Sequence, residues 1–406
     1  MLAGFSNAMA LLSGFLVVPS LLFQAGMDFT GAYTAFMLIS AVGTILAGRQ
    51  SAQPLALVPG VAMASWLVYG EIISHGTSWQ AVLGASFLAS ALGFFLWLSP
   101  LRRVILEAVP EVLRRSLSVG LGLMLLLQGL LQGRLLVGSS FSVTMLGDLS
   151  DPVAFFSLVG ILVTLALLAN GVPGSLAIGT VATAALSFWE GFWVIPEAPF
   201  LLPEGLDRVA FQLDLWEGIC RPGILLPILL VVMMDSWGAA AAFQEIRPGG
   251  ECLSRRLFFC LMGTGAAGAL LGSLPPRLAP ESAAGIAAGG SERASYATAF
   301  FLALLLFCEP VLKEAASFSA IAVPATVGAG VFLLRPAGAL FGGDVADAAA
   351  SLCLVLLMPL SHDVAAGLGI ALLVHVALKL FGRQGSSVPW EEAALAALFA
   401  LYFFFL

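Results

Sequence analysis

Charged residues are scarce in this chain. Lys, Arg, Asp and Glu together make up 10% of the 406 residues, whereas 60% of the residues are hydrophobic. A soluble domain carries about 25% charged residues, because its surface must face water. The composition therefore excludes a soluble enzyme and a disordered protein, and it indicates a membrane protein.

Basic clusters, paired cysteines and catalytic motifs are also lacking. The net charge is −7 and no basic patch occurs, so we expect no nucleic acid as a partner. The five cysteines are scattered without a C-x-x-C pair, which indicates neither a disulfide framework nor a zinc site. No P-loop, G-x-S-x-G, H-E-x-x-H or kinase pattern is present. We therefore expect no cofactor and no metal, and a membrane-embedded enzyme or receptor is disfavoured.

Long apolar runs, by contrast, are abundant. The first 48 residues contain no Lys or Arg, so residues 1–25 lack the charged start of a signal peptide and are predicted as a membrane span. A helix needs about 20 apolar residues to cross ~30 Å of hydrocarbon. This length predicts fourteen spans, at 4–24, 30–47, 54–73, 79–99, 115–133, 151–170, 172–192, 223–244, 254–274, 276–291, 295–313, 317–335, 344–360 and 362–381. Residues 391–406 are predicted as a further hydrophobic stretch or short last helix.

Loop charges predict the orientation. With loops assigned to alternate sides, the side of the N-terminus collects 12 Lys and Arg residues, Arg102, Arg103 and Arg383 among them, and the other side collects 5. Cytoplasmic loops carry such an excess of basic residues. We therefore expect a multi-pass protein of the cytoplasmic (inner) membrane, in contact with lipid and with its N-terminus in the cytoplasm.

The chain divides into two similar halves of seven spans each, joined by the polar connection 193–222. Because seven is odd, the second half enters the membrane inverted, as in many secondary transporters. Residues 57–64 resemble residues 278–285 at an offset of 221, and both segments lie in the third span of their half. Each has a short extended piece, then a proline (Pro59 or Pro280), then small helix-forming residues.

The two prolines predict broken helices. A proline removes an N–H group, and the half-helix that follows exposes unpaired N–H groups with partial positive charge. Irregular backbone at membrane depth must line a cavity or be buried in protein, so matched breaks predict a substrate site. The alternative is two proline-kinked helices with a packing role.

Two carboxylates lie deep in the predicted spans. Asp235 is flanked by apolar turns in the eighth span, and Glu281 opens the half-helix of the tenth. A carboxylate at this depth must be paired, hydrated or protonated, so both residues are candidates to bind a polar solute and to carry a coupling proton. The alternative role for Glu281 is to cap the helix that starts at Ser282.

Other polar residues near the breaks carry weaker indications. Arg277 precedes Glu281 by four residues, about 13 Å along an extended strand, which favours a side chain that snorkels to the outer interface. The alternative is an anion contact between the half-helices. His362 and Asp363 follow Pro359 between two spans and are interpreted as a polar break rather than a proton relay.

Several segments carry a resemblance to a known family. Residues 281–290 have the sequence E-S-A-A-G-I-A-A-G-G, close to the family pattern E-S-A-A-G-V-A-A-G-G. Residues 54–60 (P-L-A-L-V-P-G) and 78–85 (S-W-Q-A-V-L-G-A) are similar to P-I-A-L-A-P-G and S-W-Q-T-A-L-G-A. Residues 120–123 (G-L-G-L) and 358–360 (M-P-L) follow in family order. On these motifs the chain resembles the AzgA-like purine permeases, a branch of the nucleobase–ascorbate transporter (xanthine/uracil permease) superfamily.

The resemblance implies an all-α polytopic fold of about fourteen transmembrane segments in two inverted seven-segment repeats, with broken third and tenth segments. A core domain would comprise residues 1–100 and 222–315, and a gate domain residues 101–221 and 316–383, with 384–406 as a C-terminal tail. Members of the superfamily often form homodimers through the gate domain. The implied function is proton-coupled symport of a nucleobase, a purine-like small molecule.

The resemblance also implies the site. Asp235 matches the family's eighth-span acid and Glu281 its tenth-span acid; both would hydrogen-bond the base, and one would carry the coupled proton. The site is expected to lie between the two broken spans and to face the eighth. The further predicted substrate contacts are Gly60, Val61, Ser282 and Asn7, where Asn7 replaces the usual Thr.

The chain departs from the family at polar positions. The third-span pattern P-G-M-G-L-N-A is P-G-V-A-M-A-S at residues 59–65, and the family's T-T-T-T run is P-P-R-L at residues 275–278. Lost hydrogen-bonding partners imply a different substrate or looser selection. The alternative function is a small-anion or organic-acid transporter on the same fold, in which Arg277 and the half-helix N-termini bind the anion.

Overall fold

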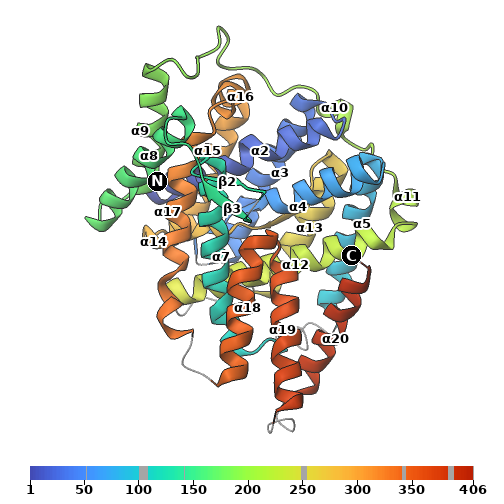
Figure 1. The fold of residues 1–406 in the computed structure, drawn as a ribbon. Coiled ribbons are helices and arrows are strands. Elements are labelled where there is room, and N and C mark those ends of the chain that lie inside the picture. Colours follow the sequence, from blue (N-terminus) through green and yellow to red (C-terminus); the bar gives the residue numbers. More distant parts are fainter. Residues whose placement is uncertain are drawn as a thin grey trace.

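The computed structural model describes residues 1–51, 53–99, 108–140, 142–247, 254–340, 344–382 and 388–405. Arg102, Arg103, Arg383 and the predicted domain boundary after residue 100 lie outside these residues. The described chain is mostly helical, and many of its helices run roughly along one direction, as expected for a bundle that crosses a membrane (Figure 1).

The first half holds seven segments. Its elements are α1 (Leu2–Ala10), α2 (Leu12–Gln24), α3 (Phe29–Gln50), β1 (Leu57–Pro59), α4 (Val61–Ser65), η1 (Trp66–Ser74), α5 (Trp79–Leu98), α7 (Glu111–Gln132), α8 (Pro152–Ala169) and α9 (Ser175–Trp189). Side-chain caps fix several starts, because the first N–H groups of a helix have no partner within it. Asp28 accepts the N–H of Gly31 at 2.9 Å, and Ser78 accepts that of Ala81 at 3.1 Å.

The second half repeats this order. Its elements are α12 (Pro222–Ile246), α13 (Arg255–Leu271), β4 (Pro276–Leu278), η2 (Pro280–Ser282), α14 (Ala283–Ala287), α15 (Glu292–Leu305), η3 (Leu306–Cys308), α16 (Glu309–Ala316), η4 (Ser319–Ile321), α17 (Val323–Leu333), η5 (Arg335–Ala339), α18 (Val345–Ser361) and α19 (Val364–Phe381). The predicted tail contains α20 (Trp390–Phe405), which packs against α19.

All fourteen predicted spans coincide with these segments. Eight helices in the described residues are long and apolar enough to cross a membrane; the other spans are short, bent or broken. The first span bends by 48° between α1 and α2. The third and tenth are broken as predicted, and the architecture of two inverted repeats is confirmed.

The two breaks meet in a short antiparallel pair of strands. β1 pairs with β4 in the register Leu57 with Leu278, Val58 with Arg277 and Pro59 with Pro276. The N–H of Ala279 also donates to the carbonyl oxygen of Ala56 at 3.0 Å. The repeat offset of 221 maps Leu57 onto Leu278, its own partner in the ladder. The pseudo-twofold axis therefore passes between these two residues.

The connections hold structure that the sequence patterns did not predict. Between α7 and α8, β2 (Leu136–Gly138) and β3 (Thr144–Leu146) form a hairpin. Between the halves, α10 (Leu206–Val209) packs on α3, and α11 (Leu215–Ile219) packs on α5.

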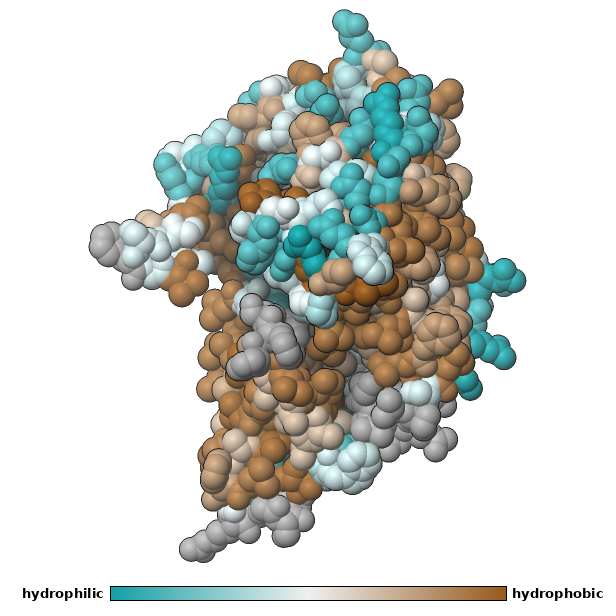
Figure 2. Space-filling view, turned by 90° about the vertical axis from the view of Figure 1, so that its right-hand side faces the viewer, coloured by the Kyte–Doolittle hydropathy of each residue, from teal (hydrophilic) through white to brown (hydrophobic). Residues whose placement is uncertain are grey.

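Apolar side chains cover much of the outer surface. Figure 2 shows a broad hydrophobic area over the lower part and the side of this face, with hydrophilic side chains gathered toward the upper end. Phe95, Leu162 and Val181 are among the exposed apolar residues of the long helices. A surface of this kind matches lipid and confirms a multi-pass membrane protein.

A buried polar cluster attaches the last helix. His375 on α19 is 1% exposed, and its Nδ1 contacts Glu392 of α20. The other ring nitrogen, Nε2, lies 3.0 Å from Asp347 of α18. Helices α18, α19 and α20 accordingly stand side by side (Figure 1).

Candidate substrate-binding site

The broken third span brings backbone to the middle of the molecule. After β1, Gly60 is extended (φ −81°, ψ 139°), and α4 then starts at Val61 without a side-chain cap. Its first N–H groups therefore remain available to a ligand. The segment continues as the nine-residue π-helix η1, a rare conformation that occurs frequently at functional sites.

Asp235 lies in the middle of α12, a helix of 25 residues, and is 5% exposed. One carboxylate oxygen, Oδ2, is 3.5 Å from Nε of Arg277. The other, Oδ1, is buried without a hydrogen-bond partner in the described residues. Asp235 is therefore buried inside the protein, and one of its two carboxylate oxygens is left without a hydrogen bond from the described residues.

Arg277 lies on β4 between the two acids. Its Nη2 is 3.8 Å from Oε1 of Glu281, and the side chain is 7% exposed. The expectation that it snorkels to the outer interface is wrong, because β4 pairs with β1 and keeps the guanidinium inside. A Cβ atom on Gly60 would overlap Nε of Arg277, so the glycine provides the space for this side chain.

Three other predicted residues lie around the breaks. Glu281 is 7% exposed and faces Arg277, but it does not line the cavity beside α4. Ser282 accepts the N–H of Ala56 through Oγ at 3.0 Å. Asn7 donates from Nδ2 to the carbonyl oxygen of Pro54 at 3.1 Å. In this structure Ser282 and Asn7 hold the strand segments in place.

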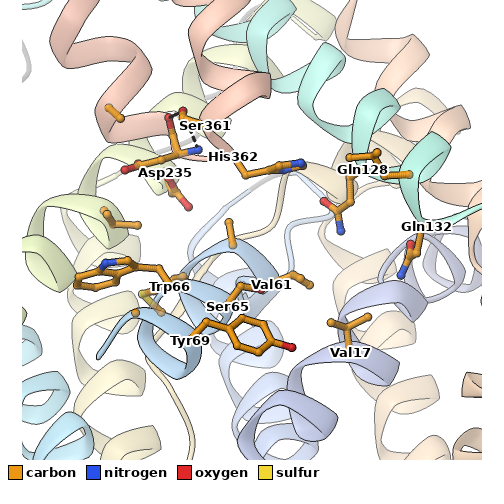
Figure 3. A pocket seen from close by; sticks show the side chains of 17 residues that line it. Val17, Val61, Ser65, Trp66, Tyr69, Gln128, Gln132, Asp235, Ser361 and His362 are labelled. Atoms are coloured by element: carbon orange, nitrogen blue, oxygen red, sulfur yellow. Dashed lines mark hydrogen bonds between the residues drawn. The ribbon is translucent and has the colours of Figure 1, made fainter. Parts of the chain in front are cut away.

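The cavity beside Asp235 and α4, here called the main cavity, has a volume of about 680 Å³. Its walls come from α2, α4, η1, α7, α12 and the junction of α18 with α19. Asp235 and Val61 are the predicted site residues that line it, and Figure 3 shows Asp235 with Trp66 on one side and Gln128 with Gln132 on the other. The wall is mainly apolar with a few polar groups, as is usual for small-molecule sites.

Several lining residues were missed by the sequence patterns. They are Trp66, Tyr69, Gln128 and Gln132, together with His362 and Asp363, which were interpreted only as a polar break. Gln128 and Gln132 were detectable as two amides one helical turn apart in residues 119–133, which are otherwise apolar. His362 is in the left-handed conformation (φ 52°), and Asp363 caps α19 at the N–H of Ala365. No cluster of three metal-ligating residues was found in the described chain.

The fold matches solved membrane transporters. The transmembrane domain of the cyanobacterial bicarbonate transporter BicA aligns with a TM-score of 0.55 and 13% identity, over 90% of this chain and 96% of that one. SLC26A9 aligns with a TM-score of 0.55 and 14% identity, over 93% of this chain and 66% of that one. At this identity the likeness establishes the fold: an inverted-repeat transporter fold of the membrane.

Sequence relatives define the family. A protein of Methanocaldococcus jannaschii that is described as a permease is 30% identical to this chain over 415 residues. The alignment covers 100% of this chain and 94% of that protein. The guanine/hypoxanthine permease PbuO of Bacillus subtilis is 27% identical over 99% of this chain and 95% of its own. The adenine permease AdeQ of Escherichia coli is 23% identical over 99% and 91%. No family model matches the chain.

The chain belongs to this permease family, the AzgA-like branch of the nucleobase–ascorbate transporter superfamily. It is a transporter and not an enzyme. The resemblance drawn from residues 281–290 and 54–60 is thereby confirmed over the whole length of the chain.

Proposed function

We propose that the protein is a proton-coupled symporter of a purine-like nucleobase in the cytoplasmic membrane, with its N-terminus in the cytoplasm. The observation that carries the proposal is the unpaired Oδ1 of Asp235 at the wall of the main cavity. A carboxylate accepts N–H groups, which nucleobases present along their edges. The relatives that transport guanine, hypoxanthine or adenine support this substrate class.

The charges around the site support proton coupling. Asp235 and Glu281 supply two negative charges when ionised, and Arg277 between them supplies one positive charge. One bound proton would bring the net charge of Asp235, Glu281 and Arg277 to zero. Binding of an uncharged base would leave their net negative charge unchanged. Because unbalanced charge is costly at membrane depth, uptake of a proton with the base lowers the barrier to crossing.

The position of the cavity supports alternating access between a core domain (1–100 and 222–315) and a gate domain (101–221 and 316–383). Asp235 on α12 and Val61 on α4 would belong to the core, and Gln128 on α7 and His362 to the gate. A relative movement of the two domains would open the cavity to one side and then to the other. We further propose a homodimer formed through the gate domain.

A small-anion transporter is the second candidate, because BicA, a bicarbonate transporter, shares the fold and Nη1 of Arg277 is buried without a hydrogen-bond partner among the described residues. The two acids that flank Arg277 disfavour it, since each repels an anion. The main test is thermal unfolding of the purified chain with hypoxanthine, adenine, guanine, uracil, bicarbonate or sulfate. A ligand at 100 times its Kd stabilises the folded state by about 2.7 kcal/mol. Stabilisation by an anion and by none of the bases would overturn the proposal.

Coupling is tested with Asp235→Asn in proteoliposomes, with Asp207→Asn in the exposed connection as the matched control. An inward proton gradient should drive base accumulation by the parent chain and the control, and an uncoupler should abolish it. The Asp235→Asn variant imitates the protonated acid, so it should exchange base across the membrane but not accumulate it. Full response of this variant to the gradient would show that Asp235 is not the coupling residue.

A further inference from the structure

Helix α7 places two amide side chains on the cavity wall. Gln128 and Gln132 are one helical turn apart, so their side chains share a face of the helix. Figure 3 shows both on the side of the cavity opposite Asp235. Neither residue belongs to the acid-and-arginine group that binds the base in the proposed function.

The side-chain amides of Gln128 and Gln132 have no hydrogen-bond partner among the residues that the structure describes. Oε1 of Gln132 is buried without such a partner, although the main-chain oxygen of the same residue accepts from Oγ of Ser319 at 2.8 Å. The structure gives no hydrogen bond from the Gln128 side chain to any described residue. Leucine and glycine fill positions 129–131 between them. A buried polar atom without a partner is unfavourable, so a ligand is the expected partner of Oε1 of Gln132, and the Gln128 amide lines the same cavity one turn away.

The two walls of the cavity offer different chemistry. An ionised Asp235 can only accept hydrogen bonds, whereas each glutamine amide both donates and accepts. A planar base between them must therefore present N–H to Asp235 and a neighbouring donor and acceptor to α7. Purines with an oxo or amino group at position 6 have such an edge, and unsubstituted purine has no exocyclic group there.

We propose that Gln128 and Gln132 are specificity-determining residues, which bind the edge of the purine that faces away from Asp235 and select bases with an exocyclic oxo or amino group. The inference rests on the proposed function, since it assumes a purine in the main cavity. It adds a recognition surface on the gate side, and the base then bridges α12 and α7.

The test is the affinity of purified full-length protein for hypoxanthine, adenine and unsubstituted purine, measured by calorimetry. The variants are Gln128→Leu and Gln132→Leu, with Gln212→Leu in the exposed connection as the control. We expect each cavity variant to lose about 5- to 150-fold in affinity for the better of the two substituted bases. Affinity for unsubstituted purine should change less than about 3-fold, because that ligand lacks the group the amides bind.

The ratio of two affinities in one preparation does not depend on the fraction of active protein, so partial misfolding does not imitate the result. If a leucine variant does not fold, Gln132→Glu keeps the shape and the acceptor but removes the donor, and the same ratio is measured. An equal loss for all three ligands, or no loss, would overturn the specificity role while leaving the proposed function intact. A parent chain that binds no purine would overturn both.

Discussion

The broken spans of the two halves share the order of a short strand followed by a short helix, but their side chains differ. At the offset of 221, Ala56 corresponds to Arg277 and Gly60 to Glu281, so the first break is apolar and the second is charged. The first break forms part of the cavity wall through α4 and η1, whereas Glu281 faces Arg277 outside it. The two breaks are therefore related by the repeat, but their side chains have different roles. The first break lines the cavity, and the second carries the charged residues.

The two breaks also depend on each other. The guanidinium group of Arg277 occupies the space that a side chain at position 60 would fill, and its Nε would overlap a Cβ atom there. The loss of a side chain in one repeat therefore accommodates the gain of a large side chain in the other. Substitutions at both breaks can test this dependence.

The largest effect is expected for Arg277→Leu. Removal of the guanidinium leaves Asp235 and Glu281 without their cation, and the loss of one member of a buried ion pair costs about 3–5 kcal/mol. Chemical denaturation of the purified protein measures the loss. Arg208→Leu is the control, since Arg208 pairs with Asp28 at the surface. An exposed ion pair of this kind contributes at most about 1 kcal/mol to the stability of a protein. Equal losses for the two variants would contradict the buried role of Arg277.

A smaller effect is expected for Glu281→Gln. The variant keeps the size of the side chain and leaves Arg277 paired with Asp235, so no charge is left alone. We expect the affinity for the base to fall about 5- to 150-fold, which corresponds to ~1–3 kcal/mol of binding free energy. Calorimetry should show a much smaller change for Glu245→Gln near the end of α12. Comparable affinities of the two variants would argue against a role for Glu281.

Gly60→Ala should destabilise the protein by about 1–3 kcal/mol, because the new methyl group overlaps Arg277. Gly263→Ala on α13, with no atom within 4 Å of its added methyl group, is the control and should be neutral or stabilising. In an Arg277→Leu background the cost of Gly60→Ala should fall, which a double-mutant cycle measures. Strict additivity would show that the two breaks are independent.

The smallest effect is expected at the serines that support the strands. Ser282 accepts the N–H of Ala56 at 3.0 Å, and Ser236 accepts that of Leu278 at 3.1 Å. Either change to Ala should cost about 1 kcal/mol, since each leaves one buried N–H without its acceptor. Thermal unfolding should give nearly equal shifts for the two variants. A much larger shift for one variant would show that β1 and β4 depend unequally on these two hydrogen bonds.

Sequence patterns predicted much of the fold, because hydrophobic length and proline position act locally. They located the fourteen spans, the breaks at Pro59 and Pro280, and the deep carboxylate Asp235. They misplaced Arg277, since distance along an extended strand does not reveal that β4 turns beside β1. The cavity face of Gln128 and Gln132 depends on how α7 is rotated against the core, which its own sequence does not determine.

The pairing of β1 with β4 has a consequence for biosynthesis. Leu57 and Leu278 are partners, yet 221 residues separate them in the chain. At 5–20 residues per second, the ribosome makes the second strand roughly 11 to 44 s after the first. Throughout that interval the unpaired N–H and C=O groups of β1 must be kept out of hydrocarbon, by water, by the insertion machinery or by earlier helices. The first half therefore cannot complete the hydrogen bonds of its broken span until the tenth span has been translated.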